Sequence, residues 1–101
     1  MSSLSAVLNA VVSEQLAELR TQPYDRLILL PDHRGTKVVR DNMKLEMYVW
    51  HDVLDSGEHR IVVQVGKPGI LGSWRLDANG FAINSRNERR DLTEDELSSF
   101  L

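Results

Sequence analysis

The chain of 101 residues has no cysteine, and this absence removes several kinds of chemistry at once. It excludes disulfides, a thiolate nucleophile, zinc bound by cysteine and iron–sulfur clusters. Repeats and low-complexity segments are lacking too, and no segment has the composition of an interdomain linker. The apolar fraction of 42% and the charged fraction of 27% are those of a folded globular protein. The sequence therefore predicts a single domain over residues 1–101.

Long apolar runs are missing as well. No segment approaches the ~20 apolar residues that a membrane-spanning helix needs. No Lys or Arg precedes Arg20, so the basic start of a signal peptide is lacking. These two absences predict a cytoplasmic protein with no membrane partner. The net charge is only −3, whereas proteins that rely on bulk attraction to nucleic acid are usually strongly basic.

What is present begins with an amphipathic helix. Its apolar positions recur every three or four residues: Leu4, Val7, Leu8, Val11, Val12, Leu16 and Leu19. Ser2 or Ser3 can accept a hydrogen bond from a free N–H at the helix start, and Pro23 cannot continue the helix. We expect a helix from about Ser3 to about Arg20 that covers one face of a sheet, or that also pairs with a second copy.

Short strands are predicted in the region that follows. Leu27–Leu30 is an apolar run that ends at Pro31, which favours a buried strand over a helical turn. Asp32–Gly35 is typical of a loop, and Thr36–Val39 is expected to form a second short strand.

The alternating segment Lys44–Leu54 indicates a longer strand, and Arg60–Val65 is its return strand. The intervening Asp55-Ser56-Gly57 predicts a three-residue hairpin loop, with Gly57 in the left-handed conformation. The resulting register pairs Val49 with Val63, Met47 with Val65, His51 with Ile61 and Asp52 with Arg60. A two-residue loop would mix apolar and polar side chains on both faces.

Farther along, Gly66–Gly69 has the composition of a turn, and Ile70–Asp77 that of a strand. Asn79-Gly80 is the strongest hairpin signal in the chain, because a type I′ turn needs positive φ at both central residues. That hairpin would gather five apolar side chains on one surface: Trp74, Leu76, Ala78, Phe81 and Ile83.

The chain ends in a predicted short helix. Thr93 and Glu96 have the spacing of a capping box at its start, and Leu97, Phe100 and Leu101 supply a small apolar face. The predicted fold class is therefore α+β. An N-terminal amphipathic helix packs on a mostly antiparallel β-meander of about four to six strands, followed by the short C-terminal helix.

No arrangement of residues typical of catalysis is found. None of His33, His51 and His59 has the helical spacing of a metal motif, and there is no nucleophile elbow or phosphate-binding loop. We predict no catalytic residue, no cofactor and no metal ligand, and hence a protein that is not an enzyme.

The candidate site is the polar face of the central hairpin. Tyr48 and Trp50 share this face with Val62 and Arg60 of the return strand, and aromatic side chains inside a polar rim are typical of a protein interface. Alternatively, the C-terminal helix or the Leu27–Val39 segment covers these side chains.

Three classes of function are consistent with the sequence. The leading hypothesis is a non-enzymatic protein-interaction module, similar in size and class to small bacterial immunity or adaptor proteins. Its partner would be another protein or a second copy, which makes a homodimer possible. The alternative is a nucleic-acid-binding domain in which Arg86, Arg89 and Arg90 contact phosphates beside the aromatic face. A small-ligand-binding protein or enzyme would need a deep pocket that the sequence does not indicate.

Overall fold

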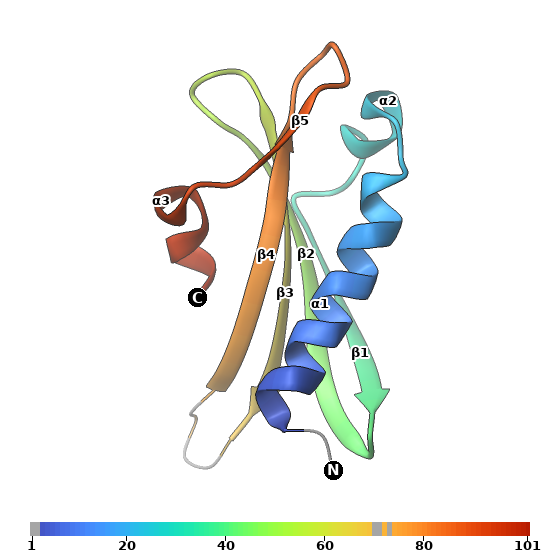
Figure 1. Cartoon of the computed structure of the whole chain (residues 1–101), viewed down its shortest axis with the longest axis vertical. Helices are drawn as coiled ribbons and strands as arrows, with labels where there is room; N and C mark the ends of the chain where they lie inside the picture. Colours follow the sequence, from blue (N-terminus) through green and yellow to red (C-terminus); the bar gives the residue numbers. More distant parts are fainter. Residues whose placement is uncertain (1–2, 70–71, 73) are drawn as a thin grey trace.

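One antiparallel sheet forms the centre of the structure, a computed structural model that describes residues 3–69, 72 and 74–101. Its elements in chain order are α1 (Leu4–Arg20), α2 (Tyr24–Leu27), β1 (His33–Arg40), β2 (Met43–Val53), β3 (His59–Pro68), β4 (Trp74–Ile83), β5 (Arg89–Asp91), α3 (Glu94–Leu97) and the 3-10 turn η2 (Ser98–Phe100). Every strand pairs with its neighbour in sequence, in the order β1-β2-β3-β4-β5 (Figure 1). The predicted α+β fold is therefore confirmed.

Helix α1 forms as its sequence pattern predicts. The Ser3 hydroxyl accepts a hydrogen bond from Ala6 N at 3.1 Å and caps the first turn. The helix ends at Arg20, three residues before Pro23. The six buried side chains of α1 all belong to the predicted apolar face: Val7, Leu8, Val11, Val12, Leu16 and Leu19.

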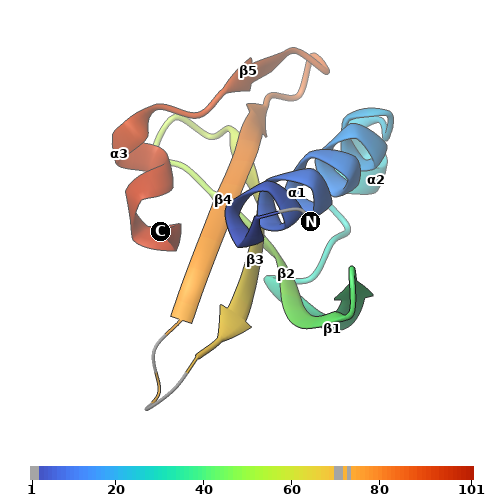
Figure 2. The same cartoon turned by 60° about the horizontal axis from the view of Figure 1, so that its bottom comes forward.

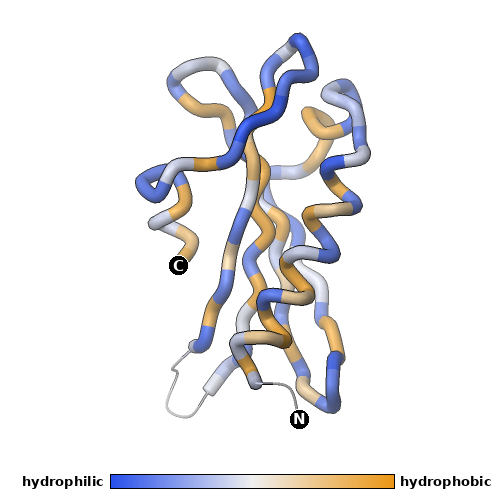
Figure 3. Tube along the Cα trace, viewed as in Figure 1, coloured by the Kyte–Doolittle hydropathy of each residue, from blue (hydrophilic) through white to orange (hydrophobic). Residues whose placement is uncertain are grey.

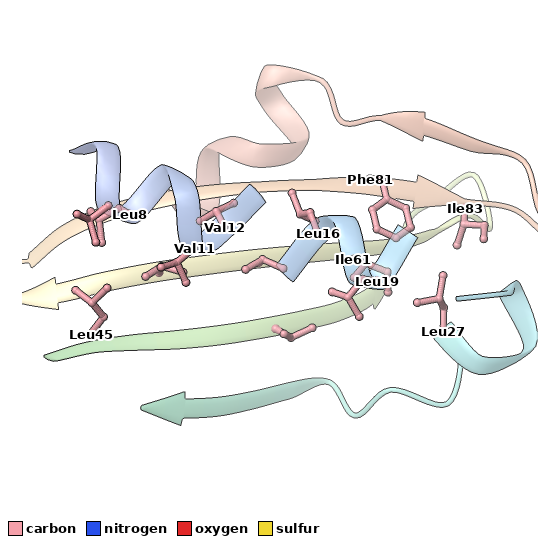
Figure 4. Packing of buried hydrophobic residues seen from close by; sticks show 14 residues of the cluster. Leu8, Val11, Val12, Leu16, Leu19, Leu27, Leu45, Ile61, Phe81 and Ile83 are labelled. Atoms are coloured by element: carbon pink, nitrogen blue, oxygen red, sulfur yellow. The ribbon is translucent and has the colours of Figure 1, made fainter. Parts of the chain in front are cut away.

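The core lies between α1 and one face of the sheet, which we call the inner face (Figures 2 and 4). The strands contribute Leu45, Val49, Ile61, Val63, Val65, Phe81 and Ile83, and α2 adds Leu27 at one end. None of these side chains exceeds 3% exposure. Hydrophobic and hydrophilic positions alternate along much of the strands (Figure 3), so a second set of side chains points to the opposite, outer face.

The β2–β3 hairpin has the predicted register. Leu54 N donates to Glu58 O at 2.8 Å, Gly57 N donates to Leu54 O at 2.8 Å, and Gly57 has a φ of 87°. The predicted partners therefore face one another: Val49 and Val63, Met47 and Val65, His51 and Ile61, Asp52 and Arg60.

The predicted hairpin at Asn79-Gly80 is wrong. β4 runs unbroken through both residues, which face Val63 and Val62 on β3. Gly80 is needed for space rather than for a turn, because a Cβ there would collide with the carbonyl oxygen of Ile61 and lie 3.0 Å from Leu92 Cδ1.

The continuous strand also separates the apolar surface that the hairpin would have gathered. Phe81 and Ile83 point into the core on the inner face, where both are buried. Trp74, Leu76 and Ala78 have the opposite parity and lie on the outer face.

Two other loops use positive φ where the sequence reading did not expect it. Asp41 and Asn42, with φ of 51° and 61°, form the two-residue connection of β1 and β2, as a type I′ turn requires. Between β4 and β5, Asn87 has a φ of 65°, and Asn84 N donates to Glu88 O. Asn87 N also donates to Asn84 O, so this loop has the same two hydrogen bonds as the Gly57 loop, and Asn87 takes the position of the glycine.

Three further predictions need correction. Leu27–Leu30 is not a strand: Leu27 ends α2, and residues 28–30 form a turn. The strand predicted at Thr36–Val39 is present but begins at His33, inside the predicted loop. β3 continues through Gly66 to Pro68, where a turn was predicted, and the predicted strand start at Ile70 lies outside the described residues.

Substituting Gly80 tests the unbroken course of β4. Gly80→Ala is expected to lower the free energy of unfolding by about 1–3 kcal/mol, because the added methyl group has no room. Asn79→Ala removes only an exposed side chain that accepts from Gly80 N at 2.8 Å, and should cost about 1 kcal/mol or less. Urea unfolding measures both. A cost for Asn79→Ala equal to that of Gly80→Ala would contradict the continuous strand.

Candidate functional site

The outer face brings all four residues of the predicted interaction surface together. Tyr48 and Trp50 lie on β2, and Arg60 and Val62 lie on β3, with Trp50 facing Val62 in the register. Their exposure differs, however. Val62 is 0% exposed and is enclosed by the protein itself, whereas Tyr48 and Trp50 are half-buried.

The C-terminal segment, residues 92–101, covers part of this face. Phe100 places its ring 6.1 Å from that of Trp50, and the Arg60 guanidinium lies over Phe100 at 5.1 Å. The Phe100 carbonyl also accepts from Gln64 Nε2 at 2.8 Å, and the Glu96 carbonyl accepts from Arg60 Nη1 at 2.7 Å. Trp50, Val62 and Arg60 therefore serve partly or wholly as a docking surface for the chain's own end.

Ion pairs tie the C-terminal segment to the rest of the protein. No residue of α3 or η2 is fully buried. Arg90 forms paired hydrogen bonds with Glu96, both at 2.8 Å, and with Glu58 at 2.9 and 3.0 Å. The Arg90 hydrogen bonds, followed by that from Thr93 N, lower the pKa of Glu96 to about 2. Arg90 thus links Glu96 of the C-terminal segment to Glu58 of the β2–β3 loop.

Beside the covered part, three hollows follow one another along β1 and β2. The first, of about 460 Å³, lies between Trp50, His33 and Phe100. The second, of about 160 Å³, is lined by Gly35, Tyr48 and other residues. The third, of about 420 Å³, shares two lining residues with the second and is also lined by Val39 and Pro68. We call the three together the β1–β2 groove.

Tyr48 occupies the middle of the groove for a steric reason. It faces Gly35 across the β1–β2 pair, and a Cβ at Gly35 would lie only 2.9 Å from Tyr48 Cε1. The glycine therefore lets the ring lie flat over β1. The Tyr48 hydroxyl donates to Glu46 at 3.2 Å, and this hydrogen bond raises the pKa of Tyr48. The sequence reading missed the contribution of β1 because it placed Gly35 in a loop.

The two ends of the groove differ in charge. Asp32 and Asp52 line the first hollow, although Asp52 is already bound by Arg60 at 2.8 and 2.5 Å. Lys37 and Lys44 line the third hollow, with Glu46 between them. The groove is therefore acidic where the chain enters β1 and mainly basic near the Asp41-Asn42 turn.

The arginines predicted as a phosphate-binding patch are largely engaged within the protein. Arg90 is held by Glu58 and Glu96, and Arg89 donates to the carbonyl oxygen of Gln22. Arg86 has a side chain that is 84% exposed and lies 4.0 Å from Glu88. The structure does not bring the three guanidinium groups to one free surface.

Two histidines form a hydrogen-bonded pair on the inner face near α2. His51 Nδ1 lies 2.9 Å from the Leu30 carbonyl, which can only accept, so the neutral ring carries its proton on Nδ1. His51 Nε2 then accepts from His59 Nδ1 at 2.8 Å. Burial lowers the pKa of His59, and the positive charge that His51 would carry when protonated lowers it further. The sequence reading paired His51 with Ile61 correctly, but had no signal for the contact between the two rings.

Comparisons with known proteins found no match: no family model, no curated protein and no solved structure is similar to this chain. Within residues 3–69, 72 and 74–101, no group of three or more acidic or histidine side chains is placed to hold a metal ion. None of the described helices is long and apolar enough to cross a membrane. The function therefore has to be inferred from the geometry of the site itself.

The histidine pair gives the protein a predicted pH dependence of stability. The folded-state pKa of His59 is lowered, so the folded protein loses stability as the pH falls from about 6.5, the value of a free histidine, through the lowered pKa. His59→Asn keeps an N–H that can donate to His51 but does not titrate. Urea unfolding at about pH 7.5 and about pH 5 should therefore show a smaller difference for this variant than for the native protein.

The exposed His33 provides the matched control, since it faces Trp50 on the outer face, whereas the pair lies on the inner face. His33→Asn should retain the difference between the two pH values seen in the native protein. If His59→Asn also retains it in full, the histidine pair is not the source of the pH dependence.

Proposed function

We propose that this protein is a non-enzymatic protein-interaction module that binds an extended segment of a partner protein in the β1–β2 groove. The observation that supports this most directly is the row of three hollows on the outer face. They follow the strands rather than forming one deep pocket, and aromatic or apolar side chains line each of them. The cytoplasmic location predicted from the sequence is part of this proposal.

The spacing of the hollows suits an extended peptide. They lie against Trp50, Tyr48 and Glu46, which are successive outer-face positions of β2. Alternate residues on a strand are about 7 Å apart, and a peptide in the same conformation presents side chains to one side at the same interval. A segment of about six residues would span the groove, which is about 20 Å long from Trp50 to Lys44.

The charges of the groove favour one direction for the bound segment. A basic side chain suits the first hollow, where Asp32 is exposed beside the aromatic rings of Trp50 and Phe100. An acidic side chain suits the third hollow, beside Lys37 and Lys44. Such complementarity contributes more to specificity than to affinity, so the partner is expected to carry opposite charges at the two ends of an apolar stretch.

A selection from a library of random short peptides tests this proposal, with the full-length chain as bait. Binding of the enriched peptides is measured by the fluorescence of Trp50 in a Trp74→Phe background. We expect the enriched sequences to place basic and acidic residues on either side of apolar ones. Tyr48→Ala should weaken their binding about tenfold or more, since it removes a central aromatic contact.

Two controls separate the groove from general effects of mutation. Tyr48→Phe keeps the ring over Gly35 and loses only the hydroxyl, so binding should persist. Leu29→Ala changes a side chain that is 77% exposed outside the groove, and should leave binding unaltered. The proposal fails if no peptide is enriched, or if the enriched peptides bind Tyr48→Ala as well as they bind the native chain.

A further inference from the structure

Among the described residues, the edge of β4 that faces away from β3 pairs with another strand along only part of its length. β5 pairs only with Phe81–Ile83, and α3 lies beside the half of β4 that is nearer to β5 (Figure 1). Residues 74–80 therefore have β3 on one side and no strand on the other within the described part of the chain. An unpaired edge of this length is a ready template for another strand.

The backbone hydrogen bonds of β4 show which residues face this edge. Ala78 N donates to the Asp77 side chain at 3.0 Å, and Gly80 N donates to that of Asn79 at 2.8 Å. Because N–H groups of alternate residues point to the same side of a strand, the even-numbered residues from Trp74 to Gly80 direct their backbone groups outward. A second strand would replace the two local side-chain contacts with strand pairing.

Charge distinguishes the three registers in which two copies of this edge centre on Arg75, Leu76 or Asp77. In an antiparallel pair related by a two-fold axis, centring on Arg75 or on Asp77 would place like charges directly opposite each other, which is destabilising. Centring on Leu76 places Arg75 of each copy opposite Asp77 of the other. Leu76 then faces its own counterpart, and Trp74 faces Ala78.

The same register covers the exposed apolar side chains of β4. Trp74 and Leu76 are 43% and 41% exposed, and both lie on the outer face, where the facing residues of the second copy would meet them. The opposite edge of the sheet does not offer this match. β1 carries Arg34, Lys37 and Arg40 without an acidic residue between His33 and Arg40, so two copies of β1 would repel each other.

We propose that two copies of this chain associate through the free edges of β4, forming one continuous sheet with Leu76 at the two-fold axis. Two reciprocal ion pairs, each between Arg75 of one copy and Asp77 of the other, fix the register. The first two hollows of the β1–β2 groove lie two strands away from the paired edge, whereas the third reaches Pro68, opposite Trp74. The association does not rest on the proposed peptide binding.

Charge reversal tests the pairing. Arg75→Asp places two acids opposite each other in both ion pairs, and Asp77→Arg places two basic groups there. Each variant should weaken self-association about tenfold or more relative to the native chain. Sedimentation equilibrium of the full-length chain measures the dissociation constant. An equimolar mixture of the two variants restores opposite charges at both pairs, and should therefore form a heterodimer more tightly than either variant associates with itself.

If the mixture forms a one-to-one complex, both variants are folded, since misfolded chains would not associate in this way. Arg34→Glu, on the other edge strand, is the matched control and should dimerise as the native chain does. A native chain that stays monomeric up to its solubility limit would overturn the proposal. So would a native dimer that both single reversals leave intact, or a mixture of the two variants that stays monomeric.

Discussion

The packing of α1 on the inner face of the sheet is the interaction on which the rest of the structure depends. Six side chains of α1 are buried there, against core residues from β2, β3 and β4. A helix of 17 residues is about 25 Å long and covers one face only. The chain has no second long helix among its described elements, so the outer face is left to a segment of ten residues at the C-terminus.

This imbalance explains why the two faces of the sheet differ in character. On the inner face, apolar contact excludes water along the whole helix, and the only buried polar side chain there, among the described residues, is His51, which is hydrogen-bonded. On the outer face, the cover depends on Arg60 and Arg90 bridging to the C-terminal segment. Charged contacts near the surface contribute little stability compared with apolar burial, so the outer face is held less firmly.

The sequence predicted those parts of the fold in which local signals and burial agree. The spacing in α1, the Gly57 loop and the Thr93 capping box each have a local physical cause, and each is present. Asn79-Gly80 failed because the same two residues satisfy two different requirements. A type I′ turn needs glycine for its φ, whereas β4 needs glycine because the backbone of β3 and Leu92 leave no room for a Cβ. Only the tertiary structure distinguishes these requirements.

The candidate site was predicted only in part, again for reasons of tertiary structure. Strand parity correctly placed Tyr48 and Trp50 on the outer face, because the Gly57 loop fixed the register. It gave no information on Phe100, which reaches Trp50 from 50 residues away in sequence, or on Gly35, which was assigned to a loop. The ion pairs of Arg90 were likewise invisible, since Glu58 and Glu96 are distant in the chain and meet only after the sheet has formed.

The sequential order of the strands has a consequence for how the chain folds. Because β1 to β5 pair only with their neighbours in sequence, the sheet can grow hairpin by hairpin, with short loops to close at each step between β1 and β3. The contacts of α1 with β3 and β4 are of another kind, since they join parts of the chain that are far apart in sequence. Local contacts form faster than distant ones, because loop closure costs less entropy. The central hairpin is therefore expected to form early, and docking of α1 is expected to be among the last steps to be completed.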